Sequence, residues 1–92
     1  MSLNIIYSNH FKKDLKKIEK QGKNNKLIDE AVEIITNKKI MPREYFNHKL
    51  NGEYPNCKEL HIKPNWLLIY RETSNDIHLL RTGTHSQLFR KN

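Results

Sequence analysis

Histidine and arginine residues in the second half of the chain are the side chains whose types could do chemistry. Arg81 and His85 lie on either side of a glycine in the segment L-R-T-G-T-H-S-Q-L-F, which begins at Leu80, and His48 and His61 lie upstream. Imidazoles move protons near neutral pH, and a guanidinium can bind two phosphate oxygens at once. Cleavage of RNA by its own 2′-hydroxyl needs a base, an acid and a cation beside the phosphorus, and these residue types provide all three.

The overall charge of the chain fits an anionic partner. The 92 residues include 17 Lys and Arg against 10 Asp and Glu, which gives a formal net charge of +7. Such an excess favours nucleic acid as a partner. We expect an RNA backbone to follow the lysines of a predicted first helix, namely Lys12, Lys13, Lys16 and Lys17. A solvated helix face is the alternative interpretation of these lysines.

Metal and disulfide chemistry have no support in the sequence. It contains no CxxC, no HExxH, no clustered Asp pair and no glycine-rich phosphate loop, so we expect neither a metal nor a cofactor. The single cysteine, Cys57, cannot form an internal disulfide, which is typical of a reducing compartment. No apolar run approaches the roughly 20 residues of a membrane span. These features predict a cytoplasmic protein without a membrane partner.

Hydrophobic periodicity predicts one domain over residues 1–92, with the element order β-α-α-β-β-β. A strand over 3–7 is expected to lead, through an N-cap at Ser8, into two helices that pack as an antiparallel hairpin. A loop over 41–54 then precedes an antiparallel meander over 57–63, 66–72 and 77–82, and a last helical turn over 86–89. The fold class is therefore α+β, a small antiparallel sheet with the two helices packed on one side.

The two short turns of the meander predict its register. A two-residue loop at Pro64-Asn65 places His61 opposite Leu68, and a four-residue loop over 73–76 places Leu68 opposite Arg81. His61 and Arg81 would then share one row on one face, with about 9.5 Å between their backbones. The opposite face is expected to meet the helices through the apolar residues Leu60, Ile62, Leu67, Ile69 and Leu80.

Three further side chains have two interpretations each. Trp66 could stack on a nucleobase, although packing in the core is the commoner use of a lone tryptophan. Phe89 could stack on a base near the site or close the core. Arg81 could bind a phosphate or form an ordinary ion pair, for which Glu59 is a candidate partner.

Four motifs resemble those of the YafQ branch of the RelE/ParE toxin superfamily. They are H-K-L at His48, E-L-H ending at His61, P-N-W-L-L-I-Y from Pro64, and R-T-G-T-H-S-Q-L-F from Arg81. The resemblance covers essentially the whole chain, and the last motif is the most specific. It implies the RelE-like microbial RNase fold, with a small antiparallel sheet and two helices packed on one side.

The resemblance also implies an activity and a set of partners. It implies a ribosome-dependent endoribonuclease toxin that cuts mRNA in the A site of the 30S subunit without a metal, and so inhibits translation. A cognate antitoxin, acidic in its toxin-binding segment, would hold it in check, and operator DNA would be bound only through their complex. By this carry-over, His48, His61 and His85 are catalytic, with His85 as the general acid, Arg81 stabilises the transition state, and Phe89 positions the mRNA.

Asn65 departs from the P-D-W pattern of the family. A neutral amide cannot accept a proton as a carboxylate can, so the role of base would pass to His61 or His48, and Asn65 is kept only as a candidate site residue. The amide favours one alternative, a member of the same superfamily that binds RNA or antitoxin without cutting. A gyrase poison of the ParE kind is another alternative, although such relatives usually lack the matched histidines. A DNA-binding ribbon protein would leave the histidines unexplained.

Overall fold

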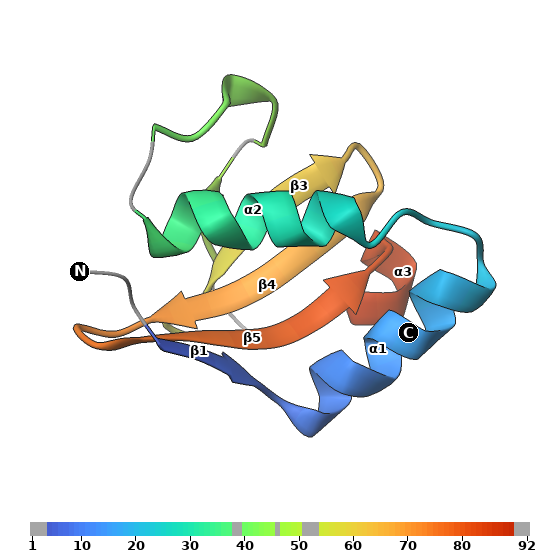
Figure 1. The fold of residues 1–92 in the computed structure, drawn as a ribbon, viewed down its shortest axis with the longest axis horizontal. Helices are drawn as coiled ribbons and strands as arrows, with labels where there is room; N and C mark the ends of the chain where they lie inside the picture. Colours follow the sequence, from blue (N-terminus) through green and yellow to red (C-terminus); the bar gives the residue numbers. More distant parts are fainter. Residues whose placement is uncertain (1–3, 38–39, 46, 51–53, 90–92) are drawn as a thin grey trace.

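A five-stranded sheet with two helices on one face forms the protein. The computed structural model describes residues 4–37, 40–45, 47–50 and 54–89. The elements are β1 (Asn4–Tyr7), α1 (Asn9–Lys20), α2 (Lys26–Thr36), the 3-10 turn η1 (Arg43–Tyr45), β2 (His48–Lys49), β3 (Lys58–Lys63), β4 (Trp66–Glu72), β5 (Asp76–Gly83) and α3 (His85–Leu88). The strand order is β1-β5-β4-β3-β2 (Figure 1). The predicted α+β class is therefore confirmed.

The start and the end of α1 follow from local sequence chemistry. Ser8 is the N-cap, and its hydroxyl oxygen accepts a hydrogen bond of 3.0 Å from the backbone N–H of Phe11. The same hydroxyl donates to the carbonyl of Leu80 on β5, which anchors the helix start to the sheet. Gly22, just past the last turn, has a φ of +77°, a left-handed conformation that favours glycine. The predicted N-cap is confirmed.

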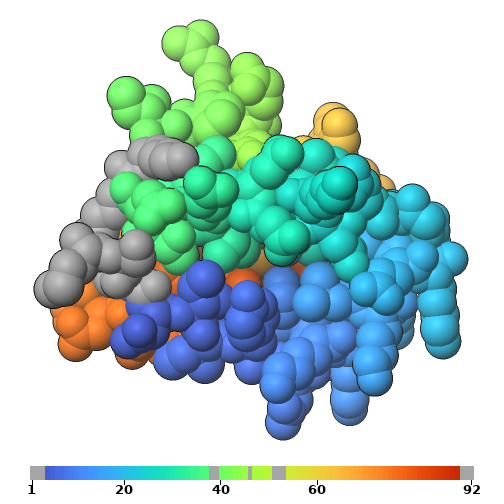
Figure 2. All heavy atoms as spheres, viewed as in Figure 1, coloured from blue at the N-terminus to red at the C-terminus, as the bar shows by residue number. Residues whose placement is uncertain are grey.

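Helices α1 and α2 cover the same face of the sheet. α1 packs against β5 and α2 against β3, and Figure 2 shows their side chains meeting over that face. The buried core between these layers comprises Phe11, Ile18, Ile28, Ala31, Val32, Ile35, Leu60, Ile62, Trp66, Leu68, Tyr70, Ile77 and Leu79. No helix within the described ranges is long and apolar enough to cross a membrane.

A second, smaller apolar cluster covers part of the other face of the sheet. Cys57, Leu67, Ile69 and Leu88 form it, and Tyr54, Leu80 and Phe89 pack against it. The prediction that Leu67, Ile69 and Leu80 meet the helices was therefore wrong. The physical reason is that α3 and the segment around Tyr54 cover this face, so the central strand β4 is buried on both sides.

The register of the meander differs from the prediction at two irregularities. Lys63 faces Trp66 as expected, but a shift between His61 and Lys63 places His61 opposite Leu67. A second shift places Arg81 opposite Ile69. Each irregularity adds one residue to one strand and so moves every later pair.

His61 and Arg81 consequently share a face without sharing a row. Their partners on β4, Leu67 and Ile69, both belong to the second apolar cluster. Leu68, which the prediction put between them, instead lies in the main core against the helices.

Two strands outside the meander complete the sheet. β2 lies within the region predicted as a loop, and it pairs antiparallel with β3, with His48 opposite Glu59. β1 pairs in parallel with β5, with Tyr7 opposite Leu79, and only this pairing departs from the antiparallel pattern of the described strands. Residue 3 of the first predicted strand lies outside the described residues. β2 is the edge strand of the sheet, and it places His48 beside β3.

Candidate active site

Rings from four separate segments form a row on the face of the sheet opposite α1 and α2. The ring centroids of His48 and His61 are 6.0 Å apart, and those of His61 and His85 are 5.8 Å apart. Phe89 follows at 6.3 Å from His85, and Tyr54 meets Phe89 edge-on at 5.5 Å. The structure thus brings together all three histidines that the sequence singled out. We refer to His48, His61 and His85 as the histidine row.

A buried carboxylate lies between two members of the histidine row. Oε1 of Glu59 is 3.4 Å from Nε2 of His48 and 3.4 Å from Nε2 of His61. Glu59 is only 4% exposed. An ionised carboxylate accepts hydrogen bonds only, so each Nε2 that faces it carries a hydrogen. Glu59 therefore orients two imidazoles at once.

Glu59 was missed as a site residue, and its predicted pairing with Arg81 was wrong. Strand periodicity could have found it, because residues two apart on a strand share a face. Glu59 and His61 are two apart on β3, and His48 lies opposite Glu59 on β2. The short strand β2, which completes this arrangement, lies in the region that was predicted to be a loop.

Asn65, in the turn between β3 and β4, holds His85. Its Oδ1 accepts from the backbone N–H of His85 at 3.3 Å and lies 3.2 Å from Nδ1 of the same ring. The backbone N–H can only donate, which fixes the atom facing it as the amide oxygen. Nδ1 of His85 then carries the hydrogen of the second contact, and Nε2 is left to exchange a proton with a ligand.

A capping box places His85 at the first position of α3. The Thr84 hydroxyl accepts from the backbone N–H of Gln87, and Oε1 of Gln87 accepts from the backbone N–H of Thr84 at 2.9 Å. A Cβ on Gly83 would lie 2.6 Å from that same Oε1. The glycine of the C-terminal motif therefore leaves room for the cap that orients the general-acid candidate.

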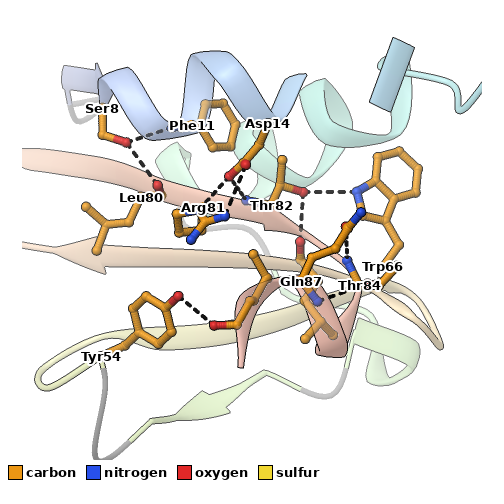
Figure 3. A network of polar contacts seen from close by, with 12 residues as sticks. Ser8, Phe11, Asp14, Tyr54, Trp66, Leu80, Arg81, Thr82, Thr84 and Gln87 are labelled. Atoms are coloured by element: carbon orange, nitrogen blue, oxygen red, sulfur yellow. Dashed lines mark hydrogen bonds and ion pairs between the residues drawn. The ribbon is translucent and has the colours of Figure 1, made fainter. Parts of the chain in front are cut away.

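Arg81 lies on the same strand as Gly83, but Asp14 of α1 engages its guanidinium. Nε donates to Oδ2 at 2.8 Å and Nη2 donates to Oδ1 at 3.2 Å (Figure 3). The backbone N–H of Thr82 donates to the same Oδ2 at 3.1 Å. The hydrogen bonds that Arg81 donates to Asp14 raise the pKa of Arg81 above its ordinary value. Arg81 is therefore a fixed cation, and its anionic partner is Asp14 rather than Glu59.

Trp66 lies in the core and not at the surface. It is 3% exposed, and its Nε1–H donates to the Thr82 hydroxyl at 2.9 Å (Figure 3). The Thr82 hydroxyl donates in turn to the carbonyl of Leu67. The prediction that Trp66 stacks on a nucleobase was wrong, because the side chain is buried in the main core, and the alternative of core packing is confirmed.

Comparison with known proteins identifies the family of the chain. The family model for the bacterial toxin of type II toxin–antitoxin system, YafQ, matches residues 3–90. The chain belongs to the YafQ toxin family. The mRNA interferase toxin YafQ of Escherichia coli K12 is 37% identical over 86 residues, which cover 92% of this chain and 94% of that protein. The family predicted from the motifs is confirmed, and it argues against the gyrase-poison and DNA-ribbon alternatives.

Solved structures of YafQ-like toxins share the fold. The E. coli DinJ-YafQ toxin-antitoxin complex matches with a TM-score of 0.88 and 31% identity, over 97% of this chain and 99% of that chain. A metal-bound toxin from Helicobacter pylori matches with a TM-score of 0.89 and 36% identity, over 95% and 99%.

Part of the site in this YafQ-family toxin has the donor set of a metal centre. Glu59, His61 and His85 each offer a ligand atom, and these atoms lie within 4.8 Å of one another. Imidazole suits zinc and copper, and a carboxylate completes such a site. An ion bound there would occupy the nitrogens needed for proton transfer.

The lysines predicted to contact RNA lie on the outer side of α1. All of them are exposed, whereas Phe11, Asp14 and Ile18 point inward. The set comprises Lys12, Lys13, Lys16 and Lys17. This YafQ-family toxin therefore presents a basic helix face on the element that also fastens Arg81.

Proposed function

We propose that this YafQ-family toxin is an mRNA endoribonuclease that acts on the ribosome, without a metal, through attack by the RNA 2′-hydroxyl. The observation that carries the proposal is the histidine row, in which His61 and His85 lie 5.8 Å apart between ring centroids. Two imidazoles at this separation can flank one phosphate group. The name of the E. coli relative, mRNA interferase toxin, supports the substrate.

The chemistry follows from two proton transfers. A base removes the proton of the 2′-hydroxyl, and the 2′-oxygen then forms a bond to phosphorus. The bond between phosphorus and the 5′-oxygen breaks, and an acid gives that oxygen a proton, which leaves a 2′,3′-cyclic phosphate. Each proton transfer contributes a factor of roughly 10²–10⁴ to the rate. His85 suits the acid role because it is exposed and its Nδ1 is held by Asn65.

Asn65 acts by positioning and not by proton transfer. Its amide oxygen accepts from His85 in two places, but an amide cannot take up a proton at working pH. The base role therefore falls to His61 or His48, whose Nε2 atoms contact Glu59. The ring of Phe89 lies 6.3 Å from that of His85, between centroids, and a base of the mRNA can stack on it.

The proposed partners follow from charge and from the relatives. A cognate antitoxin with an acidic segment would neutralise the cations that RNA needs, and the E. coli relative is known in a toxin-antitoxin complex named DinJ-YafQ. The ribosomal A site supplies the mRNA, and the exposed lysines of α1 suit a phosphate backbone. Operator DNA would be bound through the antitoxin complex.

One experiment separates cleavage on the ribosome from its alternatives. The purified toxin is mixed with a defined mRNA, either free or bound to ribosomes with an open A site, and the cut is mapped by primer extension. We expect a cut in the A-site codon of ribosome-bound mRNA only. Cutting of free mRNA at an equal rate would refute ribosome dependence. Ribosome binding without a cut would favour the non-cleaving alternative, which the neutral amide of Asn65 also favours.

A further inference from the structure

A polar cavity lies between α1 and α3, beside the histidine row. It has a volume of about 480 Å³, and its lining includes His10, Lys17, Arg81, Ser86 and Gln87 as well as Asp14. Three of these side chains carry or can take a positive charge, Asp14 carries a negative charge, and the other two carry hydroxyl and amide groups. A cavity with these donors suits a phosphate group.

Asp14 fixes the orientation of Arg81 in this cavity. The carboxylate is 5% exposed and accepts two guanidinium hydrogen bonds, from Nε and Nη2, as well as the backbone N–H of Thr82. A guanidinium has five N–H groups, so further donors remain beside those that Asp14 takes. Because the backbone N–H of Thr82 also holds Asp14, the guanidinium cannot turn without losing its two hydrogen bonds to a fixed carboxylate.

Tyr54 connects the cavity with the histidine row. Tyr54 lines the cavity, and its ring meets that of Phe89 edge-on beside the histidine row. Its hydroxyl donates to the carbonyl of Leu88 at 2.8 Å. An RNA strand that leaves the row past Phe89 would therefore reach the cavity with a phosphate other than the one being cleaved.

We infer that this cavity is a subsite for a neighbouring phosphate of the RNA strand, and that Asp14 is the positioning residue that aims Arg81 into it. The inference rests on the proposed function for its substrate class. Arg81 would then help to hold the RNA strand, and Asp14, a buried acid in the lysine-rich helix α1, would have a role.

The test measures affinity for a short, fully 2′-O-methylated oligoribonucleotide, which cannot be cleaved. We expect Arg81→Gln to weaken binding about tenfold, the loss of one charge-assisted hydrogen bond. Asp14→Asn should weaken it similarly, and the double variant should bind no more weakly than Arg81→Gln alone. The matched control is Asp29→Asn, an exposed carboxylate on α2, which should leave affinity unchanged.

A second pair of variants does not disturb the buried ion pair. His10→Asp adds an anion to the cavity at the exposed start of α1, where an acid suits the helix dipole. Asn9→Asp adds the same charge one residue away and outside the cavity lining. We expect the first to weaken binding several times more than the second.

The outcomes separate the inference from the proposed function. Tighter binding by Asp14→Asn would show that Asp14 competes with phosphate and would overturn its positioning role. Equal effects of His10→Asp and Asn9→Asp would overturn the subsite. No binding by the wild-type protein, with or without ribosomes, would instead refute the proposed RNA substrate. In cleavage assays, the loss caused by Arg81→Gln should fall mainly on KM, and a loss confined to kcat would place Arg81 at the reacting phosphate.

Discussion

The side-chain oxygen of Asn65 lies 3.2 Å from Nδ1 of His85 and also accepts the backbone N–H of that residue. One amide thus sets both the place and the tautomer of the imidazole that we propose as general acid. The amide has no charge and cannot itself take up a proton.

Asn65→Asp should move the alkaline limb of the pH–rate profile to higher pH. A carboxylate at this place would favour the charged form of His85, so the acid would keep its proton to a higher pH. The neighbouring ring of His61 opposes the shift when it is protonated. Asn65→Ala is the control, and it should lower the rate without moving the limb upward. If the alkaline limb of the pH–rate profile is unchanged in Asn65→Asp, the contact between residue 65 and Nδ1 of His85 is contradicted.

Glu59→Gln should lower the rate of cleavage about a hundredfold, a typical effect of disabling one acid–base group. The amide keeps the shape of the side chain but removes the charge that faces Nε2 of both His48 and His61. Single-turnover rates measure the effect. Glu72→Gln, an exposed change at the end of β4, should retain the wild-type rate. Equal rates for the two variants would exclude Glu59 from the site.

Gly83→Ala should reduce cleavage at least tenfold while the protein stays folded. The added Cβ would lie 2.6 Å from Oε1 of Gln87 and would break the cap of α3, worth about 1 kcal/mol. Gly22→Ala is the matched control, because its φ of +77° penalises a side chain by about 1 kcal/mol in open space. The midpoint temperature of thermal unfolding should fall for both variants, whereas the cleavage rate should fall only for Gly83→Ala.

Removal of transition metals should leave cleavage unchanged, and added zinc should inhibit it. Phenanthroline removes such ions without depriving ribosomes of magnesium. Zinc would bind the ligand atoms of Glu59, His61 and His85 and so block proton transfer. Loss of activity in phenanthroline, restored by zinc, would contradict the metal-free mechanism.

Much of the sheet could be predicted from the sequence, because alternation and short turns mark the strands. β4 was predicted with its observed bounds, and the pairing of Lys63 with Trp66 followed from the two-residue turn. The irregularities near His61 and Ile69 could not be predicted, because β4 is buried on both faces and its continuous apolar run does not fix the register of the strands beside it.

The site was predictable only in part, for a related reason. Motifs in single segments indicated His61 and His85, whereas Glu59 gains its role only when β2 pairs with β3. In the sequence, Asp14 is an acid surrounded by lysines, with nothing to indicate its partner. Only the packing of α1 on β5 brings it to Arg81. Contacts between distant segments were thus the part that local spacing could not supply.

The measurement that tests the account most directly asks whether His85 gives the leaving oxygen its proton. Wild type, His85→Ala and the control His78→Ala are compared on ribosome-bound mRNA, with either the normal linkage or sulfur in place of the 5′-oxygen at the cleaved position. A sulfur leaving group needs no acid, so we expect His85→Ala to lose a factor of roughly 10²–10⁴ on the normal mRNA and to cleave the sulfur-containing mRNA nearly as fast as wild type. An equal loss on both substrates would contradict the role of His85 as general acid.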